Sequence, residues 1–337
     1  MKNRAVEQSQ NAEIKHSYAN VSGLKIHYSQ CGVQHSDNGV IVFLHGFPEY
    51  WGTWRHQLIA LGKSYHTIAP DLPGYNLSDK PSNNAFYKIE NLIKVLSEFI
   101  AQVSNNQPVY LVAHDWGGAI AWPLVAFNQQ LVKKLVILNA AHPSTFTREM
   151  KYNGEQRLRS GYIHQLISPQ AENLLSENQF SYLFEQIMTG LAKDLVTDQL
   201  KSEYLAIWQQ PGAINGMLQY YRAMPQLAAD TKSIGYKDTY ARDNSKLSQS
   251  NSTTKTESPL TTLEAITIPK IMIKVPTLVL WGAQDQAFVI ECLDGLEDYV
   301  QDLTIKQFPD NSHWLQHEQP DAITQAIGYF VKNTAQC

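Results

Sequence analysis

The sequence predicts an α/β fold: a mostly parallel sheet flanked by helices and interrupted by a helical cap. Over the first 142 residues, apolar runs of strand length alternate with amphipathic helical patterns. Such alternation is typical of parallel sheets with right-handed crossovers. From about residue 143 to residue 270 the strand-like runs stop, and an aromatic-rich, mostly helical pattern replaces them. Strand-like runs resume near residue 275, so the helical stretch divides the sheet-forming sequence in two.

The first part of the core is expected to span residues 12–142. Residues 24–30 alternate between apolar and polar side chains, as a half-buried strand does. Residues 89–103 space their apolar side chains by three and four positions, which predicts an amphipathic helix. Four more runs are apolar and β-branched, which predicts strands buried on both faces: 39–46, 65–71, 108–115 and 133–141.

The cap is expected to span residues 143–270, and the second part of the core residues 271–335. Within the cap, the polar, low-complexity stretch near 231–260 lacks the apolar side chains that would order it. We therefore expect a mobile surface loop there. In the second part of the core, two runs predict buried strands and one predicts a closing helix: 275–285, 303–313 and 319–333 respectively.

Composition narrows the function classes. The net charge of −4 favours neither nucleic acid nor an anionic membrane surface as a partner. The longest apolar runs are strand-length, below the roughly 18 residues of a membrane span, and no apolar stretch follows the basic N-terminal residues as in a secretory signal. The three cysteines have no paired spacing, which favours free thiols in the cytoplasm. No metal or nucleotide motif occurs, so neither a metal nor a cofactor is expected. Oligomeric state cannot be predicted from the sequence.

The stretch YLVAHDWGGAIAW, residues 110–122, predicts a strand, a tight turn and a helix that opens with small residues. In a strand–turn–helix elbow of this kind, the turn residue is exposed at the top of the sheet and is the nucleophile. Here that residue is Asp115, and Gly117 and Gly118 are small enough for strand and helix to cross closely. An acid before two glycines is also a common turn or helix cap. The local pattern therefore leaves both roles open.

The segment FLHGFPEYW, residues 43–51, follows another predicted strand. In enzymes with such an elbow, the loop after this strand provides one backbone N–H of the oxyanion hole, and the residue after the nucleophile provides the other. Those donors would be the amides of Phe47 and Trp116. Proline lacks an N–H and can fix the loop, including through a cis bond. The residues expected to support this loop are His45, Gly46 and Pro48.

Two more strand ends carry an acid and a histidine. Asp285 lies just past the predicted strand at 275–285, where a carboxylate can orient a histidine. His313 follows the last predicted strand, whereas His317 is expected to face solvent on a helical turn and to be structural. Each residue alone is also explained as an ordinary turn residue. Together, however, Asp115, Asp285 and His313 follow the chain order nucleophile, acid, base.

Five segments of the sequence together resemble one protein family. The segments HGFPEYWGTWRHQL, IAPDLPGYNLSDKP, AHDWGGAIAW, LNAAHPSTFTREM and NSHWLQHEQP occur in register over roughly residues 22–330. They resemble the epoxide-hydrolase branch of the α/β-hydrolase superfamily. The resemblance implies an eight-stranded, mostly parallel core with a helical cap inserted after strand 6. It also implies a nucleophile at Asp115, a histidine at His313 that acts on water, and a relay acid at Asp285.

The same resemblance implies two cap tyrosines that hold and protonate the epoxide oxygen. Tyr221, in QPGAINGMLQYYRAM, matches the position of one of them. Tyr162, in RSGYIHQLISP, matches the other within a less similar stretch. Both tyrosines are also explained by packing between cap and core.

The predicted reaction converts a small apolar epoxide and water to a vicinal diol. A carboxylate can displace a leaving group at a saturated carbon and form an alkyl ester. Haloalkane dehalogenases use the same triad and an Asp-Trp elbow, but often have Asn at the position of Phe47 as a second halide donor. Fluoroacetate dehalogenases usually have Arg at the position of Trp116. A protein of another class, which binds an apolar ligand without catalysis, is the remaining alternative.

Overall fold

The computed structural model describes residues 13–33, 36–224 and 267–333, so the predicted loop at 231–260 lies outside it. The described strands form one eight-stranded sheet in the order β1-β2-β4-β3-β5-β6-β7-β8. Strand β2 pairs antiparallel with both β1 and β4, and every other pairing is parallel. The predicted fold class is confirmed. The strands are β1 (Lys15–Val21), β2 (Leu24–Cys31), β3 (Val40–Leu44), β4 (His66–Pro70), β5 (Val109–His114), β6 (Val132–Leu138), β7 (Thr277–Gly282) and β8 (Leu303–Phe308).

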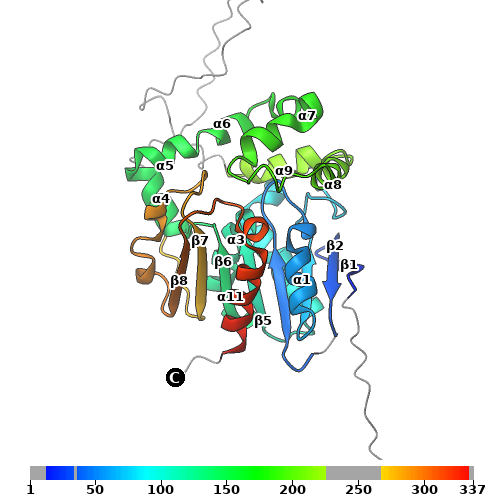
Figure 1. Ribbon diagram of the computed structural model, residues 1–337, viewed down its shortest axis with the longest axis vertical. Coiled ribbons are helices and arrows are strands. Elements are labelled where there is room, and N and C mark those ends of the chain that lie inside the picture. The colour runs from blue at the N-terminus through cyan, green and yellow to red at the C-terminus, as the bar shows by residue number, and fades with distance from the viewer. Residues whose placement is uncertain (1–12, 34–35, 225–266, 334–337) are drawn as a thin grey trace, which may run out of the picture.

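Helices cover the sheet and form the cap (Figure 1). The main helices beside the sheet are α1 (Arg55–Leu61), α2 (Ile89–Val103), α3 (Trp116–Phe127) and α11 (Pro320–Lys332). Between β6 and β7 in the sequence lie α4 (Pro143–Tyr152), α5 (Gly154–Arg159), α6 (Tyr162–Leu166), α7 (Ala171–Tyr182), the π-helical turn η4 (Leu183–Ile187), α8 (Asp198–Trp208) and α9 (Ala213–Arg222). These helices gather over one end of the sheet in Figure 1. The predicted boundaries of core and cap stay a prediction.

The cap rests on loops that follow strands of the core. The indole of Trp208 in α8 donates a hydrogen bond to the carbonyl of Pro48, 2.8 Å away. The hydroxyl of Tyr220 in α9 donates to the carbonyl of Pro73, also 2.8 Å away. Since ligands of open α/β sheets bind beyond the carboxyl ends of the strands, the cap covers the face where a site is expected.

Burial along the strands follows the apolar runs, with one exception. The side chains of β4 and β7 are entirely buried, as expected of strands with a neighbour on each side in the middle of a covered sheet. The prediction of a buried strand at 303–313 was wrong, because the four middle residues of β8 are exposed. Strand β8 is at the edge of the sheet and pairs with β7 on one side. Strand β1, at the other edge, was not predicted from the pattern at all.

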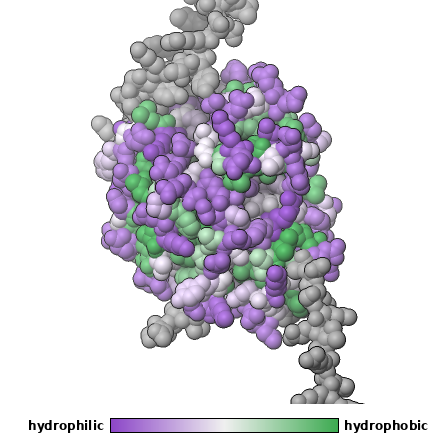
Figure 2. All heavy atoms as spheres, in the orientation of Figure 1, coloured by the Kyte–Doolittle hydropathy of each residue, from purple (hydrophilic) through white to green (hydrophobic). Residues whose placement is uncertain are grey.

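The surface and the core differ as expected of a globular protein. The face shown in Figure 2 is mostly hydrophilic, with hydrophobic side chains scattered across it. Inside, strands β3 to β7 and helix α3 contribute to one continuous core of buried side chains. Within the described parts of the chain, no helix is long and apolar enough to cross a membrane.

Helix α3 passes the end of strand β3 and the segment after β6 at very short range. A Cβ atom on Gly117 would lie 2.5 Å from the carbonyl oxygen of Leu44, and one on Gly118 would lie 2.2 Å from Cβ of Ala140. Neither approach is tolerable for a side chain. The two glycines that follow Asp115 are therefore required by packing, as the elbow pattern predicted.

We expect Gly118→Ala to lower the free energy of unfolding by about 1–3 kcal/mol, because the added methyl overpacks the contact with Ala140. This is opposite to the usual gain of about 1 kcal/mol for Gly→Ala in a helix. Urea titration followed by circular dichroism would measure the change. Gly154→Ala is the matched control, since a Cβ there meets nothing closer than 3.7 Å. Equal stabilities of the two variants would contradict the packing account.

Candidate active site

Asp115 lies at the sharp turn between β5 and α3. Its backbone has φ +49° and ψ −120°, a region that a non-glycine residue adopts at a cost of about 1–3 kcal/mol. The turn fits because Gly46 has no side chain: a Cβ there would lie 2.4 Å from Cβ of Asp115. The backbone N–H of Phe47 donates to Oδ1 of Asp115 over 2.7 Å. The strained turn thus presents the carboxylate to the loop after β3.

His313 and Asp285 meet Asp115 from the second part of the core. Nε2 of His313 lies 3.7 Å from Oδ2 of Asp115, and Nδ1 lies 2.9 Å from Oδ2 of Asp285. Asp285 is buried and fully hydrogen-bonded. Its Oδ1 accepts the backbone N–H groups of Ala287 and Phe288, and its Oδ2 accepts Nδ2 of Asn139 at 2.6 Å. The structure therefore brings the three predicted triad residues together.

The charges of this triad reinforce one another. Burial lowers the pKa of His313, but the carboxylates of Asp285 and Asp115 outweigh burial and raise it to about 10. Burial raises the pKa of Asp285. The charge of His313 and the hydrogen bonds from His313, Asn139 and the backbone of Phe288 outweigh burial and lower that pKa. In the resting protein at neutral pH, the imidazole is therefore a cation between two acids.

The raised pKa of His313 predicts how stability depends on pH. The ordinary pKa is 6.5 and the folded value is about 10. The stabilisation from the charged imidazole is therefore complete below pH 6.5 and is lost as the pH rises through 10. Urea titrations between pH 7 and pH 10 should show a steeper fall in the free energy of unfolding for the wild type than for His313→Gln. Equal slopes would mean that the imidazole is not charged.

The loop after β3 is held as its sequence suggested. The peptide between Phe47 and Pro48 is cis. His45 is completely buried: its Nε2 accepts the backbone N–H of Leu72 at 3.0 Å, and its Nδ1 lies 2.9 Å from the carbonyl oxygen of Gly46. Burial lowers the pKa of His45. Its ring therefore links the loop after β3 to the loop after β4.

The two candidate tyrosines project from the cap toward Asp115. Tyr221 in α9 is buried and packs edge-to-face on Phe47 and Trp116, with ring centroids 5.1 Å away in both pairs. Tyr162, at the start of α6, lies with its ring centroid 6.2 Å from that of Tyr221. Burial, more than any nearby charge, raises the pKa of both phenols. Both hydroxyls therefore keep their protons at neutral pH.

One buried cluster was missed in the sequence. Glu49 is completely buried, and its carboxylate lies 3.1 Å from Nδ1 of His114 and 2.7 Å from Nε2 of His317. Burial raises the pKa of Glu49, but its contacts with the two histidines outweigh burial and lower that pKa. The prediction that His317 faces solvent was wrong, because helix α10 (Leu315–Glu318) turns its ring inward to this acid. No spacing in the sequence links these three residues.

The cluster also braces the triad. His114 precedes Asp115, and its Nε2 lies 2.9 Å from the backbone carbonyl oxygen of His313. A buried acid thus holds the residue before the nucleophile against the backbone of the histidine. No grouping of three or more His, Cys, Asp or Glu side chains suited to a metal ion occurs among residues 13–33, 36–224 and 267–333.

Comparison with known proteins agrees with this fold. The family model for the alpha/beta hydrolase fold matches residues 39–320, so the chain belongs to the α/β-hydrolase superfamily. Epoxide hydrolase 4 of Mus musculus is 30% identical over 94% of this chain and 79% of its own length. The AB hydrolase superfamily protein YfhM of Bacillus subtilis is 30% identical over 95% of this chain and 99% of its own.

Solved structures narrow the relationship further. The epoxide hydrolase of Bacillus megaterium, solved in complex with an inhibitor, aligns with a TM-score of 0.76 and 29% identity, covering 94% of this chain and 100% of that one. A structure from a study of epoxide hydrolases in metagenomes from hot environments aligns with a TM-score of 0.75 and 30% identity, over 95% and 99%. Within the superfamily, the chain falls in the epoxide-hydrolase branch, and it is a hydrolase.

Proposed function

We propose that this protein hydrolyses epoxides to vicinal diols without a cofactor, with Asp115 as nucleophile. The observation that carries the proposal is the convergence of two protonated phenols, from Tyr162 and Tyr221, on a carboxylate that also meets His313. A carboxylate at a saturated carbon needs an acid for the leaving oxygen, and the phenols provide one. The epoxide-hydrolase relatives support the same reaction.

In the first step, Asp115 opens the epoxide. Its Oδ1 already accepts the N–H of Phe47, which leaves Oδ2 as the attacking atom. A new C–O bond forms to one ring carbon while the bond from that carbon to the epoxide oxygen breaks. The departing oxygen takes a proton from the phenol of Tyr221, with Tyr162 as the second hydrogen-bond donor. The product of this step is an ester between Asp115 and the substrate.

In the second step, water hydrolyses the ester. His313 removes a proton from water, whose oxygen attacks the carbonyl carbon of Asp115. The developing negative charge on Oδ1 is stabilised by the N–H of Phe47 and, as the second donor of the oxyanion hole, by the N–H of Trp116. Collapse breaks the acyl C–O bond, and the leaving alkoxide takes the proton of the attacking hydroxyl, which releases the diol and restores the carboxylate. The proton of the resting imidazolium passes to the phenolate before this step, and the proton taken from water restores the imidazolium, so water and epoxide balance the diol.

The electrostatics of the site suit this order of steps. Before the reaction, the charges of Asp285 and Asp115 raise the pKa of His313. Esterification makes Asp115 neutral and removes one of the two charges. The pKa of His313 must then fall, which frees the imidazole to act as a base. His313 is therefore a cation while Asp115 is alkylated. It becomes a base once Asp115 has been esterified.

Two alternatives are less well supported. A haloalkane dehalogenase would need a second halide donor where Phe47 stands, and a phenyl side chain donates no hydrogen bond. The indole of Trp116 instead packs against the ring of Tyr221. A protein that only binds an apolar ligand has no use for the Asp285–His313 pair held at 2.9 Å beside a strained carboxylate.

A panel of substrates tests the proposed function. Styrene oxide, aliphatic epoxides and bromoalkanes would be offered separately, while diol and halide release are followed. We expect diol from the epoxides and no halide above the background of Asp115→Ala. Halide release without diol would favour a dehalogenase. Tight binding of an epoxide with neither product would favour the binding protein.

A further inference from the structure

Two cavities that differ in polarity meet at the candidate active site. One has a volume of about 270 Å³ and the other about 520 Å³. Asp115, Tyr162 and Tyr221 line both. A substrate whose epoxide ring lies between the carboxylate and the phenols must therefore direct its two ends into different surroundings.

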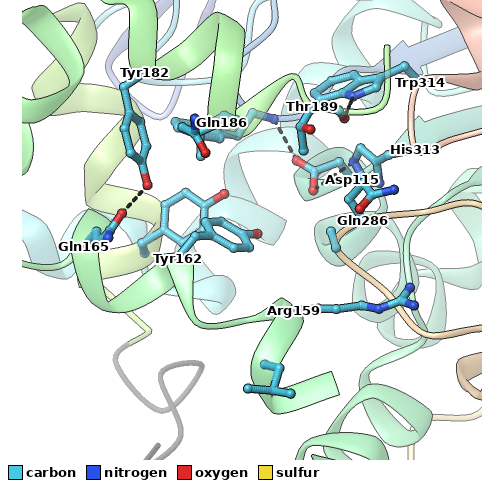
Figure 3. Close-up of a pocket in the computed structure, with 15 residues that line it drawn as sticks. Asp115, Arg159, Tyr162, Gln165, Tyr182, Gln186, Thr189, Gln286, His313 and Trp314 are labelled. Carbon is cyan, nitrogen blue, oxygen red and sulfur yellow. Dashed lines mark hydrogen bonds and ion pairs between the residues drawn. The ribbon is translucent and has the colours of Figure 1, made fainter. Parts of the chain in front are cut away.

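The smaller cavity has a mixed lining, in which hydrogen-bonding side chains from separate segments lie among apolar ones such as Leu158, Ile187 and Trp314 (Figure 3). The hydrogen-bonding side chains include Gln165 of α6, Tyr182 of α7 and Gln186 of η4, together with Gln286 in the loop after β7. The hydroxyl of Tyr182 donates to Oε1 of Gln165. His313 lines this cavity and not the larger one. A water molecule in contact with His313 would therefore lie in the smaller cavity.

The larger cavity is lined mainly by apolar side chains of core and cap. The polar residues beyond the shared site are Glu90, Thr147 and Ser160. Phe127, at the end of α3, lines this cavity and is 72% exposed. The remaining apolar wall includes Ile89, Ile93, Ala119, Phe146, Ile163 and Phe288.

We propose that the larger cavity holds the bulky apolar substituent of the substrate, while the smaller cavity holds the hydrolytic water and a small substituent. This inference rests on the proposed function and adds a substrate class: epoxides with one large apolar group and little on the other ring carbon. An apolar chain in the smaller cavity displaces water from side chains that it cannot hydrogen-bond. The same chain in the larger cavity gains apolar contacts without that loss.

Two isomers with the same atoms separate these cases. The compound trans-2,3-epoxyoctane carries a methyl and a pentyl group, whereas trans-4,5-epoxyoctane carries two propyl groups. Both are trans-dialkyl epoxides of similar intrinsic reactivity, so a difference reports on the cavities. We expect kcat/KM to be at least fivefold higher for the 2,3-isomer, because the 4,5-isomer must place a propyl group among the glutamines.

Two variants test whether the preference for the 2,3-isomer arises from these two cavities. Gln165→Leu combined with Tyr182→Phe removes both partners of one hydrogen bond, which leaves neither unpaired. It should raise kcat/KM for the 4,5-isomer. The ratio of kcat/KM for the 2,3-isomer to kcat/KM for the 4,5-isomer should fall at least twofold. Ala119→Leu fills the larger cavity one helical turn after Asp115. It should lower kcat/KM for the 2,3-isomer at least fivefold more than it lowers kcat/KM for propylene oxide, which has no bulky group.

The outcomes distinguish this inference from the proposed function. Hydrolysis of both isomers with a ratio below fivefold overturns the substrate class and leaves the epoxide hydrolase intact. A larger ratio that neither variant changes overturns the assignment to these cavities. If no epoxide, propylene oxide included, is hydrolysed by the wild type, the proposed function fails and the inference fails with it.

Discussion

Replacing His313 with Gln is expected to stop turnover after the first step, so that the substrate stays attached to the protein. Glutamine keeps a polar group at the position but cannot take the proton from water. General-base catalysis is worth about 100- to 10,000-fold, so steady-state turnover should fall by that factor. Intact-mass spectrometry should show the protein heavier by the mass of one epoxide, and peptide mapping should place the adduct on Asp115.

His317→Gln is the matched control for this experiment. The same substitution is made four residues further along the chain, at a ring that contacts Glu49. It should weaken the buried cluster and accumulate no adduct. An unmodified mass for the His313→Gln protein, under conditions in which the wild type turns over, would contradict an ester intermediate. An adduct on another residue would contradict Asp115 as the nucleophile.

Tyr221→Phe should slow the ring opening itself, by about 100-fold, because the leaving oxygen loses its proton donor. Tyr162 then provides the one remaining phenol. Stopped-flow tryptophan fluorescence would follow alkylation, since Trp116 packs directly on the ring of Tyr221. The effect should appear in the rate constant of alkylation, with ester hydrolysis little changed.

The neighbouring residue provides the control for that variant. Tyr220→Phe removes a buried hydroxyl from the same helix, with the loss of a hydrogen bond to the carbonyl of Pro73. It should lower the free energy of unfolding by about 0.5–1.5 kcal/mol and leave the alkylation rate nearly unchanged. If Tyr220→Phe slowed alkylation as much as Tyr221→Phe, proton donation would have been assigned to the wrong group.

Much of the fold followed from local pattern. Helix α2 begins and ends at the predicted residues, 89 and 103, because its apolar spacing is regular. The middle strands were clear from their continuous apolar runs. The edges were not: β1 alternates weakly, and β8 is mostly exposed although its sequence resembles that of a buried strand. Whether a strand has one neighbour or two depends on the whole sheet, which no short window contains.

The candidate site was predictable to a different degree in each part. Asp115, Asp285 and His313 all follow strands, so the chain order alone indicated that they meet. Tyr162 and Tyr221 lie on cap helices, where no periodicity marks a residue that points at the core, and only resemblance indicated them. Glu49 and its histidines were missed because their contacts span up to 268 residues of sequence.

The division of the sheet by the cap has a consequence for synthesis of the protein on the ribosome. In the proposed mechanism the nucleophile, Asp115, belongs to the first part of the chain, whereas Asp285 and His313 are translated only after the cap. A chain released before residue 313 would carry a reactive carboxylate with no means of removing an alkyl group from it. A folded fragment of this kind would react with one epoxide molecule and then stay esterified. Under the proposed mechanism, the chain can therefore complete a catalytic cycle only once residue 313 has been translated.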